Sequence, residues 1–255
     1  MVSTLFHAVF YNPIYNLLVF LVALSPGGDV GIAIVIATLI VKLLLLPLSM
    51  AAIRTQREMK RIEPLLAELK TKHPDRQEQA MKTMELYREH RINPFASIVT
   101  IFIQLPVLIT LYWVFRAEAF PTVHTALLYG FTMQPAHVSL MFLGLFDVTG
   151  HSLVLAVLAG IAQYLQAHFM SAPLETAAHS DKAEGSFQTD FARAMQVQMK
   201  YVLPLIIGTF AYTSGVVALY FITSALFQAF QEYFVLRKVR EKYSDAPVNA
   251  SQVSG

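Results

Sequence analysis

A lysine inside an apolar stretch is the residue in this sequence most able to do chemistry. Lys42 is the only charged side chain in residues 30–50. It lies about eight residues from the end of that stretch, or about 12 Å at the rise of an α-helix. A charge near the bilayer centre costs about 2.5–3.5 kcal/mol on insertion scales, so such a residue indicates a functional site. The alternative is a lysine whose alkyl stem snorkels to the membrane surface.

The side chains expected around Lys42 are polar but not acidic. Thr38 and Ser49 share its helix face at spacings of 4 and 7. No other apolar stretch carries an acidic residue at comparable depth. A charge there would therefore need water, which predicts a hydrated groove in one half of the membrane.

Polar stripes on three further segments are candidate walls of that groove. They recur at helical spacing in the second, third and last apolar segments: Ser97, Thr100 and Gln104; Gln163 and Gln166; Tyr220, Ser224, Gln228 and Gln231. The alternative is that these residues hydrogen-bond membrane helices to one another. Stripes on several helices together with one cation favour the groove.

The sequence offers no signature of catalysis. It contains no HExxH motif, no Walker motif and no glycine-rich dinucleotide loop. It also contains no cysteine, which excludes disulfides, thiolate metal sites and lipidated cysteines. We expect no enzymatic activity, no catalytic residue, no cofactor and no metal. The net charge of +2 indicates no nucleic-acid partner.

The elements that must position these residues are membrane helices. Hydrophobic residues make up 55% of the chain and charged residues 14%, against about 25% charged in soluble domains. A spanning helix needs about 20 apolar residues. We predict an all-α polytopic membrane protein of one domain, 1–255. Its five spans are 30–50, 94–115, 151–170, 201–213 and 216–236, with a turn at 213–215 between the last two. Residues 5–24 fit an amphipathic interfacial helix better than a sixth span.

The basic residues orient these spans. Lys and Arg number ten in 51–93, three in 171–200 and four in 237–255, and none in 1–41 or 117–150. By the positive-inside rule the first three segments are cytoplasmic, and the N-terminus lies outside. Five spans satisfy this pattern only if 5–24 does not cross the membrane.

The segment 51–93 is predicted to form a helical hairpin, from Arg54 to Lys72 and from Arg76 to His90, because His73-Pro74-Asp75 interrupts its helical pattern.

The motifs around these segments resemble the YidC/Oxa/Alb insertase family. The similar runs are Thr38 to Lys42 with Pro47-Leu48, Asn93-Pro94-Phe95, Ile103 to Val107, Leu111-Tyr112-Trp113, and Ser214-Gly215 followed by Leu219-Tyr220-Phe221. Their order and spacing hold over nearly the whole chain.

The resemblance implies a membrane protein insertase and chaperone that needs no nucleotide hydrolysis. Lys42 takes the position of the family's basic groove residue, and Phe221 stands where Trp or Tyr is usual. The implied groove residues are Lys42, Thr38, Gln104, Gln166, Tyr220, Phe221 and Ser224, and the implied apolar slide for an incoming helix is Leu105 and Leu108. The implied location is the plasma (inner) membrane of a bacterium. The implied partners are nascent membrane proteins and the lipid bilayer, with the ribosome and the Sec translocon as further candidates. A different class, a small transporter or channel subunit with an anion site at Lys42, stays open.

Overall fold

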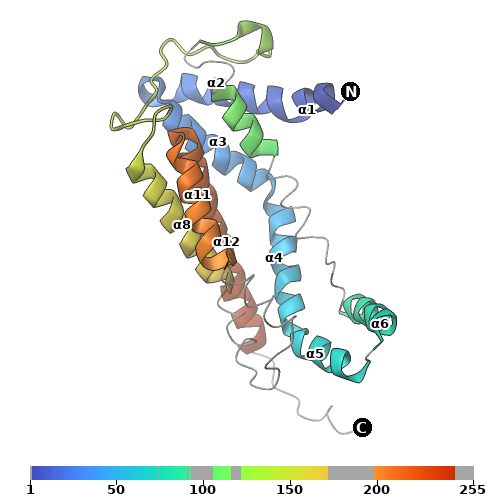
Figure 1. Ribbon diagram of the computed structural model, residues 1–255. Helices are drawn as coiled ribbons and strands as arrows, with labels where there is room; N and C mark the ends of the chain where they lie inside the picture. The colour runs from blue at the N-terminus through green and yellow to red at the C-terminus, as the bar shows by residue number, and fades with distance from the viewer. Residues whose placement is uncertain are drawn as a thin grey trace.

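The computed structural model describes residues 2–73, 75–90, 92, 106–115, 122–171 and 198–244, and most of them are helical (Figure 1). The elements in chain order are α1 (Val2–Phe6), the π-helical turn η1 (His7–Tyr11), α2 (Asn12–Leu24), the 3-10 turn η2 (Pro26–Gly28), α3 (Val30–Leu44), α4 (Leu46–Arg61), α5 (Glu63–Lys72), α6 (Arg76–Glu89), the helix Pro106–Phe115, the 3-10 turn η3 (Thr125–Leu127), β1 (Met141–Phe142), β2 (Phe146–Asp147), α8 (Leu153–Ser171), the π-helical turn η4 (Gln198–Val202), α11 (Leu203–Tyr212) and α12 (Gly215–Ser244). The predicted groove residues Gln104 and Leu105, and most of the predicted segments 94–115 and 171–200, lie outside the described residues.

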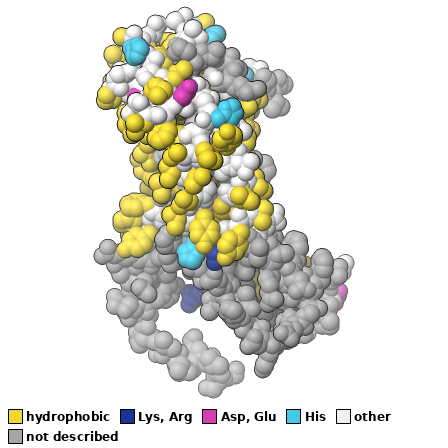
Figure 2. Space-filling view, turned by 60° about the vertical axis from the view of Figure 1, so that its left-hand side comes forward, with side chains coloured by type: hydrophobic (Ala, Val, Ile, Leu, Met, Phe, Trp, Pro, Cys, Tyr) yellow, Lys and Arg dark blue, Asp and Glu magenta, His cyan; other side chains and the backbone are white. Residues whose placement is uncertain are grey.

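Helix α12 is central to the bundle, because α8, α11 and α3 all pack against it. Its first turns are buried, as an apolar run without charges allows. By contrast, α8 and α11 expose large apolar side chains on their outer faces, and apolar side chains cover the middle of the molecule in Figure 2. The turn at Thr213 and Ser214 separates α11 from α12, where the sequence predicts it. An apolar outer surface over a packed interior is the pattern expected when lipid is the solvent.

Two glycines let α8 and α11 approach each other closely. A Cβ added at Gly208 would lie 3.4 Å from the Ala156 carbonyl oxygen and 3.6 Å from the Gly160 Cα. A Cβ added at Gly160 would lie 3.5 Å from the Pro204 oxygen. Ala156 and Gly160, small residues four apart on α8, thus meet Gly208 of α11, and small residues at such contacts let membrane helices bring their backbones together.

We expect Gly208→Leu to destabilise the bundle by about 1–3 kcal/mol, because the branches beyond Cβ have no room between the helices. Gly208→Ala is the matched control, since a methyl group at 3.4 Å fits with little movement. Thermal unfolding of both variants in detergent measures the difference. Equal unfolding midpoints for Ala and Leu would show that the two helices are not in tight contact there.

The N-terminal helix crosses the end of the bundle, at a steep angle to α8 and α12 (Figure 1). By length and composition, Thr4–Leu24 is the one single helix among the described residues that could cross a membrane, and 44% of its most apolar window is buried. Of its polar side chains, Thr4 and His7 are exposed, whereas Asn16 is buried. Asn16 holds the outer loop: its amide donates to Leu127 O at 2.9 Å and accepts from Tyr129 N at 2.7 Å. The polarity that suggests a surface helix therefore serves an internal contact.

The segment predicted as a span over 30–50 is not one straight helix. It breaks at Leu45, and α3 and the first part of α4, Leu46–Thr55, are bent by 63° yet together are apolar enough for one broken span. Pro47 explains the break, because it has no N–H to continue the helical hydrogen bonds and disfavours helical geometry in the residue before it. The chain then continues as α4 to Arg61, so the first arm of the predicted hairpin does not start at Arg54.

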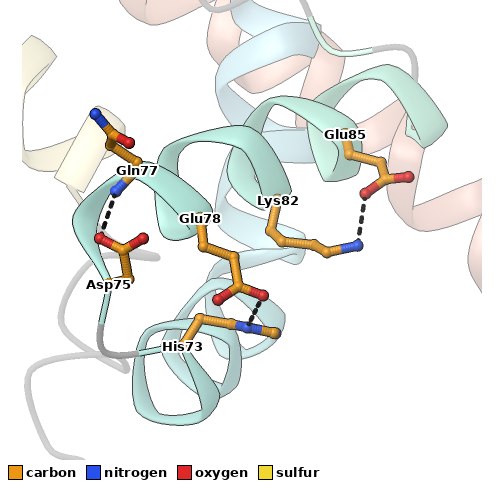
Figure 3. Close-up of polar contacts among 6 residues, drawn as sticks. All are labelled: His73, Asp75, Gln77, Glu78, Lys82 and Glu85. Atoms are coloured by element: carbon orange, nitrogen blue, oxygen red, sulfur yellow. Dashed lines mark hydrogen bonds and ion pairs between the residues drawn. The ribbon is translucent and has the colours of Figure 1, made fainter.

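The remaining hairpin is formed by α5 and α6, which pack together. A break at Ile62 separates α4 from α5, whose second residue is Pro64. Three exposed polar contacts support the connection and α6 (Figure 3): Asp75 Oδ1 accepts from Gln77 N at 3.3 Å, His73 Nδ1 lies 2.8 Å from Glu78 Oε1, and Lys82 Nζ lies 3.0 Å from Glu85 Oε2. The bond to Glu85 raises the pKa of the Lys82 ammonium above its ordinary value, so this lysine stays charged at neutral pH. The interruption predicted at residues 73–75 lies between the two helices.

Residues 122–150, which we call the outer loop after the side of the membrane predicted for them, are folded onto the helices and add two short strands to a mostly helical, all-α protein. Strands β1 and β2 pair antiparallel, with Phe142 opposite Phe146. Asp29 and Ser139 form an isolated parallel bridge. At the other end Val216 N donates to Val148 O at 2.8 Å and Gly215 N to Gly150 O at 3.2 Å. The loop thereby joins the α2–α3 turn to the α11–α12 turn.

Candidate functional site

Lys42 points into the protein. It lies in the last turn of α3 and is 6% exposed, while the next two residues, Leu43 and Leu44, are 55% and 74% exposed. A lysine that snorkels along the lipid-facing side would be exposed in the same way as these leucines. Thr38, one turn earlier on the same face, is also buried, and its hydroxyl donates to Ile34 O of its own helix at 2.7 Å. The hydroxyl proton is thus used within α3, and the oxygen can still accept.

The helix that packs against α3 presents polar groups within the interior. Tyr220, Ser224 and Gln231 of α12 are 1%, 5% and 4% exposed. Among the described residues, Gln231 Oε1 is buried and has no hydrogen-bond partner, and the same holds for Thr110 Oγ1 in the helix Pro106–Phe115. Buried polar atoms are nearly always satisfied, by protein or by water. Two such atoms in one bundle favour an interior that takes up water or polar groups of a bound chain.

Glutamines connect α12 to the helices on both sides of it. Gln163 Nε2 donates to Gln166 Oε1 at 3.0 Å on α8, and the Gln166 amide in turn donates to Gln228 of α12. Farther along α12, Gln231 Nε2 donates to Ser49 Oγ of α4 at 2.8 Å. The predicted polar stripe of α12 therefore divides: one residue bonds α8, another bonds α4. The same glutamine side chains thus hold neighbouring helices together and make the interior polar.

We expect Gln231→Leu to leave stability within about 1 kcal/mol of the original while lowering the activity proposed below. The change removes one bond to Ser49, but it also removes a buried oxygen that has no partner among the described residues, and these effects oppose each other. Ser49 keeps the bond that its hydroxyl donates to Leu46 O at 3.0 Å. Thermal unfolding measures the stability of Gln231→Leu, and insertion of a single-span protein into liposomes measures its activity. A large fall in stability would instead make Gln231 a purely structural tie.

The other predicted site residues differ in how deeply they are buried and in which side chains they contact. Tyr220 belongs to the buried core, and its ring lies 5.5 Å from that of Phe221. Phe221 is half-buried and packs edge-on against Phe210 of α11 at 6.5 Å. Of the predicted apolar slide only Leu108 is described: it is half-buried and packs against the core. On the same helix Trp113 is 46% exposed, so that helix presents an apolar outer side.

Several polar residues of the interior are missing from the set predicted as the site, among them Thr110, the half-buried Ser49 and Glu232 of α12, which is 7% exposed. Thr110 is fully buried, but a lone threonine in an apolar helix gives no signal in the sequence. Ser49 is recognisable at a spacing of 7 from Lys42, yet its partner Gln231 lies 182 residues away. Only the folded chain shows that these two side chains meet.

The hairpin offers a second candidate surface. Helix α6 exposes Met81 and Met84, at 68% and 52%, among charged side chains, and α5 exposes Leu65 at 43%. The ion pairs along the hairpin are solvent-exposed, for example Lys72 with Glu68 at 3.7 Å, and contribute little to stability. The surface is therefore suited to contact with a partner more than to holding the bundle together.

Comparison with known proteins relates this arrangement to one group. The family model described as "60Kd inner membrane protein" matches residues 21–242. A protein of Fusobacterium nucleatum subsp. nucleatum, named "Membrane protein insertase YidC", is 33% identical over 233 residues, which is 89% of this chain and 97% of that protein. Proteins with the same name from Clostridium tetani and Clostridium perfringens are 28% identical over 221 residues and 27% identical over 252 residues; they cover 86% and 96% of this chain, and the matches cover 87% and 96% of their own lengths.

Proposed function

Because the chain belongs to the 60 kDa inner membrane protein family, the YidC/Oxa/Alb insertases, we propose that it inserts other membrane proteins into the bacterial inner membrane. The observation that carries the proposal is the position of Lys42: it is a lysine in the apolar helix α3, it is 6% exposed, and α3 packs against α12, whose buried side chains include polar ones. Holding a cation there is costly, and packing an apolar residue in its place would be cheaper. A role in attracting charge on a substrate accounts for that cost.

The proposed topology has five spans with the N-terminus outside and the C-terminus in the cytoplasm. The spans are the bent pair α3–α4, the segment 94–115, α8, the helix formed by η4 and α11, and the apolar part of α12. Two observations support leaving the N-terminal helix out of this count. It runs across the end of the bundle (Figure 1). Counting it as a span would also place the N-terminus in the cytoplasm, although residues 1–41 contain no Lys or Arg.

In the proposed mechanism, a hydrated groove open to the cytoplasm lets a short polar tail travel part of the way across. Lys42 attracts acidic residues of that tail, and Thr38, Gln104, Gln166, Tyr220, Phe221 and Ser224 line its path. The apolar helix of the substrate follows along Leu105 and Leu108 into lipid, where burial of its apolar surface drives the step without nucleotide hydrolysis. The membrane potential adds about 2.3 kcal/mol per charge per 100 mV for an acidic tail that moves outward.

The α5–α6 hairpin is the proposed first contact for nascent chains, and the ribosome and the Sec translocon are candidate partners on the same side. Its exposed methionines support a role in chaperoning, because flexible thioether side chains adapt to apolar segments of many shapes. The positions of Met81 and Met84 on one exposed side of α6 give such segments a place to bind.

Insertion of a single-span protein with an acidic tail into liposomes tests the function. We expect insertion in liposomes that contain this protein and none in empty liposomes, with protease protection of the tail as the readout. Solute flux through the same liposomes is measured in parallel. Flux without insertion would replace the insertase by a transporter or channel subunit that uses Lys42 as an anion site.

A further inference from the structure

The β1–β2 hairpin has an inner and an outer side of different character. Phe142 and Phe146 face inward and pack against the core. Phe142 lies directly over Gly31 of α3, where a Cβ would come within 2.4 Å of its ring. Met141, Leu143 and Leu145 face outward and are 42%, 60% and 70% exposed. These three residues, with Gly144 between the leucines, form what we call the apolar finger.

A buried carboxylate holds the finger in shape. Leu143 adopts φ +53°, which costs a residue with a side chain free energy, and Gly144 follows at φ +70°. The Leu143 N–H donates to Asp29 Oδ2 at 2.7 Å, while Asp29 Oδ1 caps α3 by accepting from Ile32 N at 3.0 Å. Asp29 itself is 6% exposed. The exposed leucines are therefore held outward by internal contacts, and this arrangement needs an explanation.

The chemistry of the surroundings favours lipid as the surface that the finger meets. Residues 119–146 contain no Asp, Glu, Lys or Arg, so Leu143 and Leu145 at the tip of the finger have no charged neighbour in that stretch. Asp147 lies opposite Met141 at the base of the hairpin, where its Oδ1 accepts hydrogen bonds from Thr149 N and Gly150 N, so this carboxylate is at the edge of the apolar surface and not at its tip. The chain continues from β2 through residues 148–152 into α8. That helix continues the exposed apolar surface with Leu153, Val154, Val157 and Leu158, which are 68%, 54%, 52% and 46% exposed. A soluble partner would leave the adjoining face of α8 still to be covered.

We infer that Met141, Leu143 and Leu145 insert into the bilayer leaflet at the end of the bundle where α8 begins. Under the topology proposed above this is the outer leaflet. The finger thus anchors the outer loop in the membrane, and through Asp29 it fixes that end of α3 relative to the lipid surface. This inference concerns the bilayer itself as the ligand and does not depend on which substrate the protein inserts.

Single cysteines provide a direct test, because the chain contains none of its own. Leu145→Cys and, as a second position, Met141→Cys are labelled with a nitroxide after reconstitution in phosphatidylethanolamine–phosphatidylglycerol liposomes. The matched controls are Val157→Cys on the exposed face of α8 and Gln134→Cys, an exposed polar position of the same loop. We expect labels at 145 and 141 to collide with oxygen more often than with a water-soluble nickel complex, as at 157, and the reverse at 134.

Two results would overturn the inference. Labels at 141 and 145 that collide mainly with the nickel complex would place the finger in water. Labels that neither reagent reaches, in a sample where 157 and 134 behave as expected, would show that protein covers the finger, for example a second copy of this chain. Because insertion activity is not part of the readout, a failure of the proposed function and a failure of this inference are distinguishable.

Discussion

Replacing Lys42 by methionine is expected to reduce insertion of substrates with acidic tails by at least about tenfold, or about 1.4 kcal/mol in the barrier. Methionine keeps the length and apolar stem of the side chain but removes the charge. Lys42 is 6% exposed, and charges interact more strongly in such surroundings than in water. Substrates whose tails carry no acidic residue should insert nearly as well as with the original protein. Insertion of the matched pair of substrates into liposomes measures this selectivity.

Stability separates the role in insertion from a role in the fold. If the charge acts in insertion, Lys42→Met should lose insertion of acidic tails with little change in its unfolding midpoint, whereas a clear fall in the midpoint would show that the ammonium is also part of the contacts that hold the fold. Lys42→Arg keeps the charge and should retain most of the insertion of acidic tails, although its planar, larger group differs from an ammonium. Equal losses for acidic and neutral tails would contradict the charge role. Full insertion activity of Lys42→Met would show that the charge of Lys42 is tolerated in the helix and has no role in insertion.

Hydropathy predicts the segments that become α8, α11 and α12, because each of them is a continuous apolar run between polar or turn residues. The turn at Thr213 and Ser214 is predicted for the same reason. The interruption at 73–75 follows from Pro74, which cannot occupy a helix interior. Local sequence is sufficient in these places, since the preference of each residue agrees with the fold.

Local sequence does not predict the structure where contacts between residues far apart in the chain determine it. The break at Leu45 has a local sign in Pro47, but proline inside an apolar run is also compatible with a kinked span, and only packing selects the 63° bend. The position of Asn16 reads as surface polarity until its contacts with Leu127 and Tyr129 are seen. The fold of the outer loop gives no signal in the sequence, because its strands are two residues long and Asp29 bonds Leu143 across 114 positions.

The same limit applies to the candidate site. Lys42 is conspicuous because of its charge, and helical spacing correctly groups Gln163 with Gln166 on α8. Spacing cannot show that Gln228 bonds α8 while Gln231 bonds α4, because both belong to one stripe of α12. Periodicity identifies a face of a helix; the partner of each residue on that face depends on how the neighbouring helices cross it.

Gly28→Ala is expected to be among the most damaging single changes to the outer end of the protein, with a loss of more than about 3 kcal/mol of unfolding free energy. Gly28 adopts φ +68°, and an added Cβ would lie 2.0 Å from His137 O and 2.7 Å from His137 C. These are backbone atoms and cannot rotate away. If the segment 137–139 moves, two bonds are lost: Ser139 N to Gly28 O at 2.9 Å and Val30 N to Ser139 O at 3.0 Å.

Gly27→Ala is a close control for this contact. Gly27 has φ +65°, so alanine is strained there as at Gly28, but nothing lies within 4 Å of its added Cβ. Both variants also restrict the unfolded chain equally. The left-handed strain alone, about 1–2 kcal/mol, is therefore expected for Gly27→Ala, and the difference between the variants isolates the contact with His137. Thermal unfolding and protease sensitivity of the outer loop measure it. Equal losses of stability for Gly27→Ala and Gly28→Ala would mean that the loop moves away from the added Cβ at no cost in free energy. The attachment of residues 137–139 to the α2–α3 turn would then contribute nothing to stability at this end of the protein.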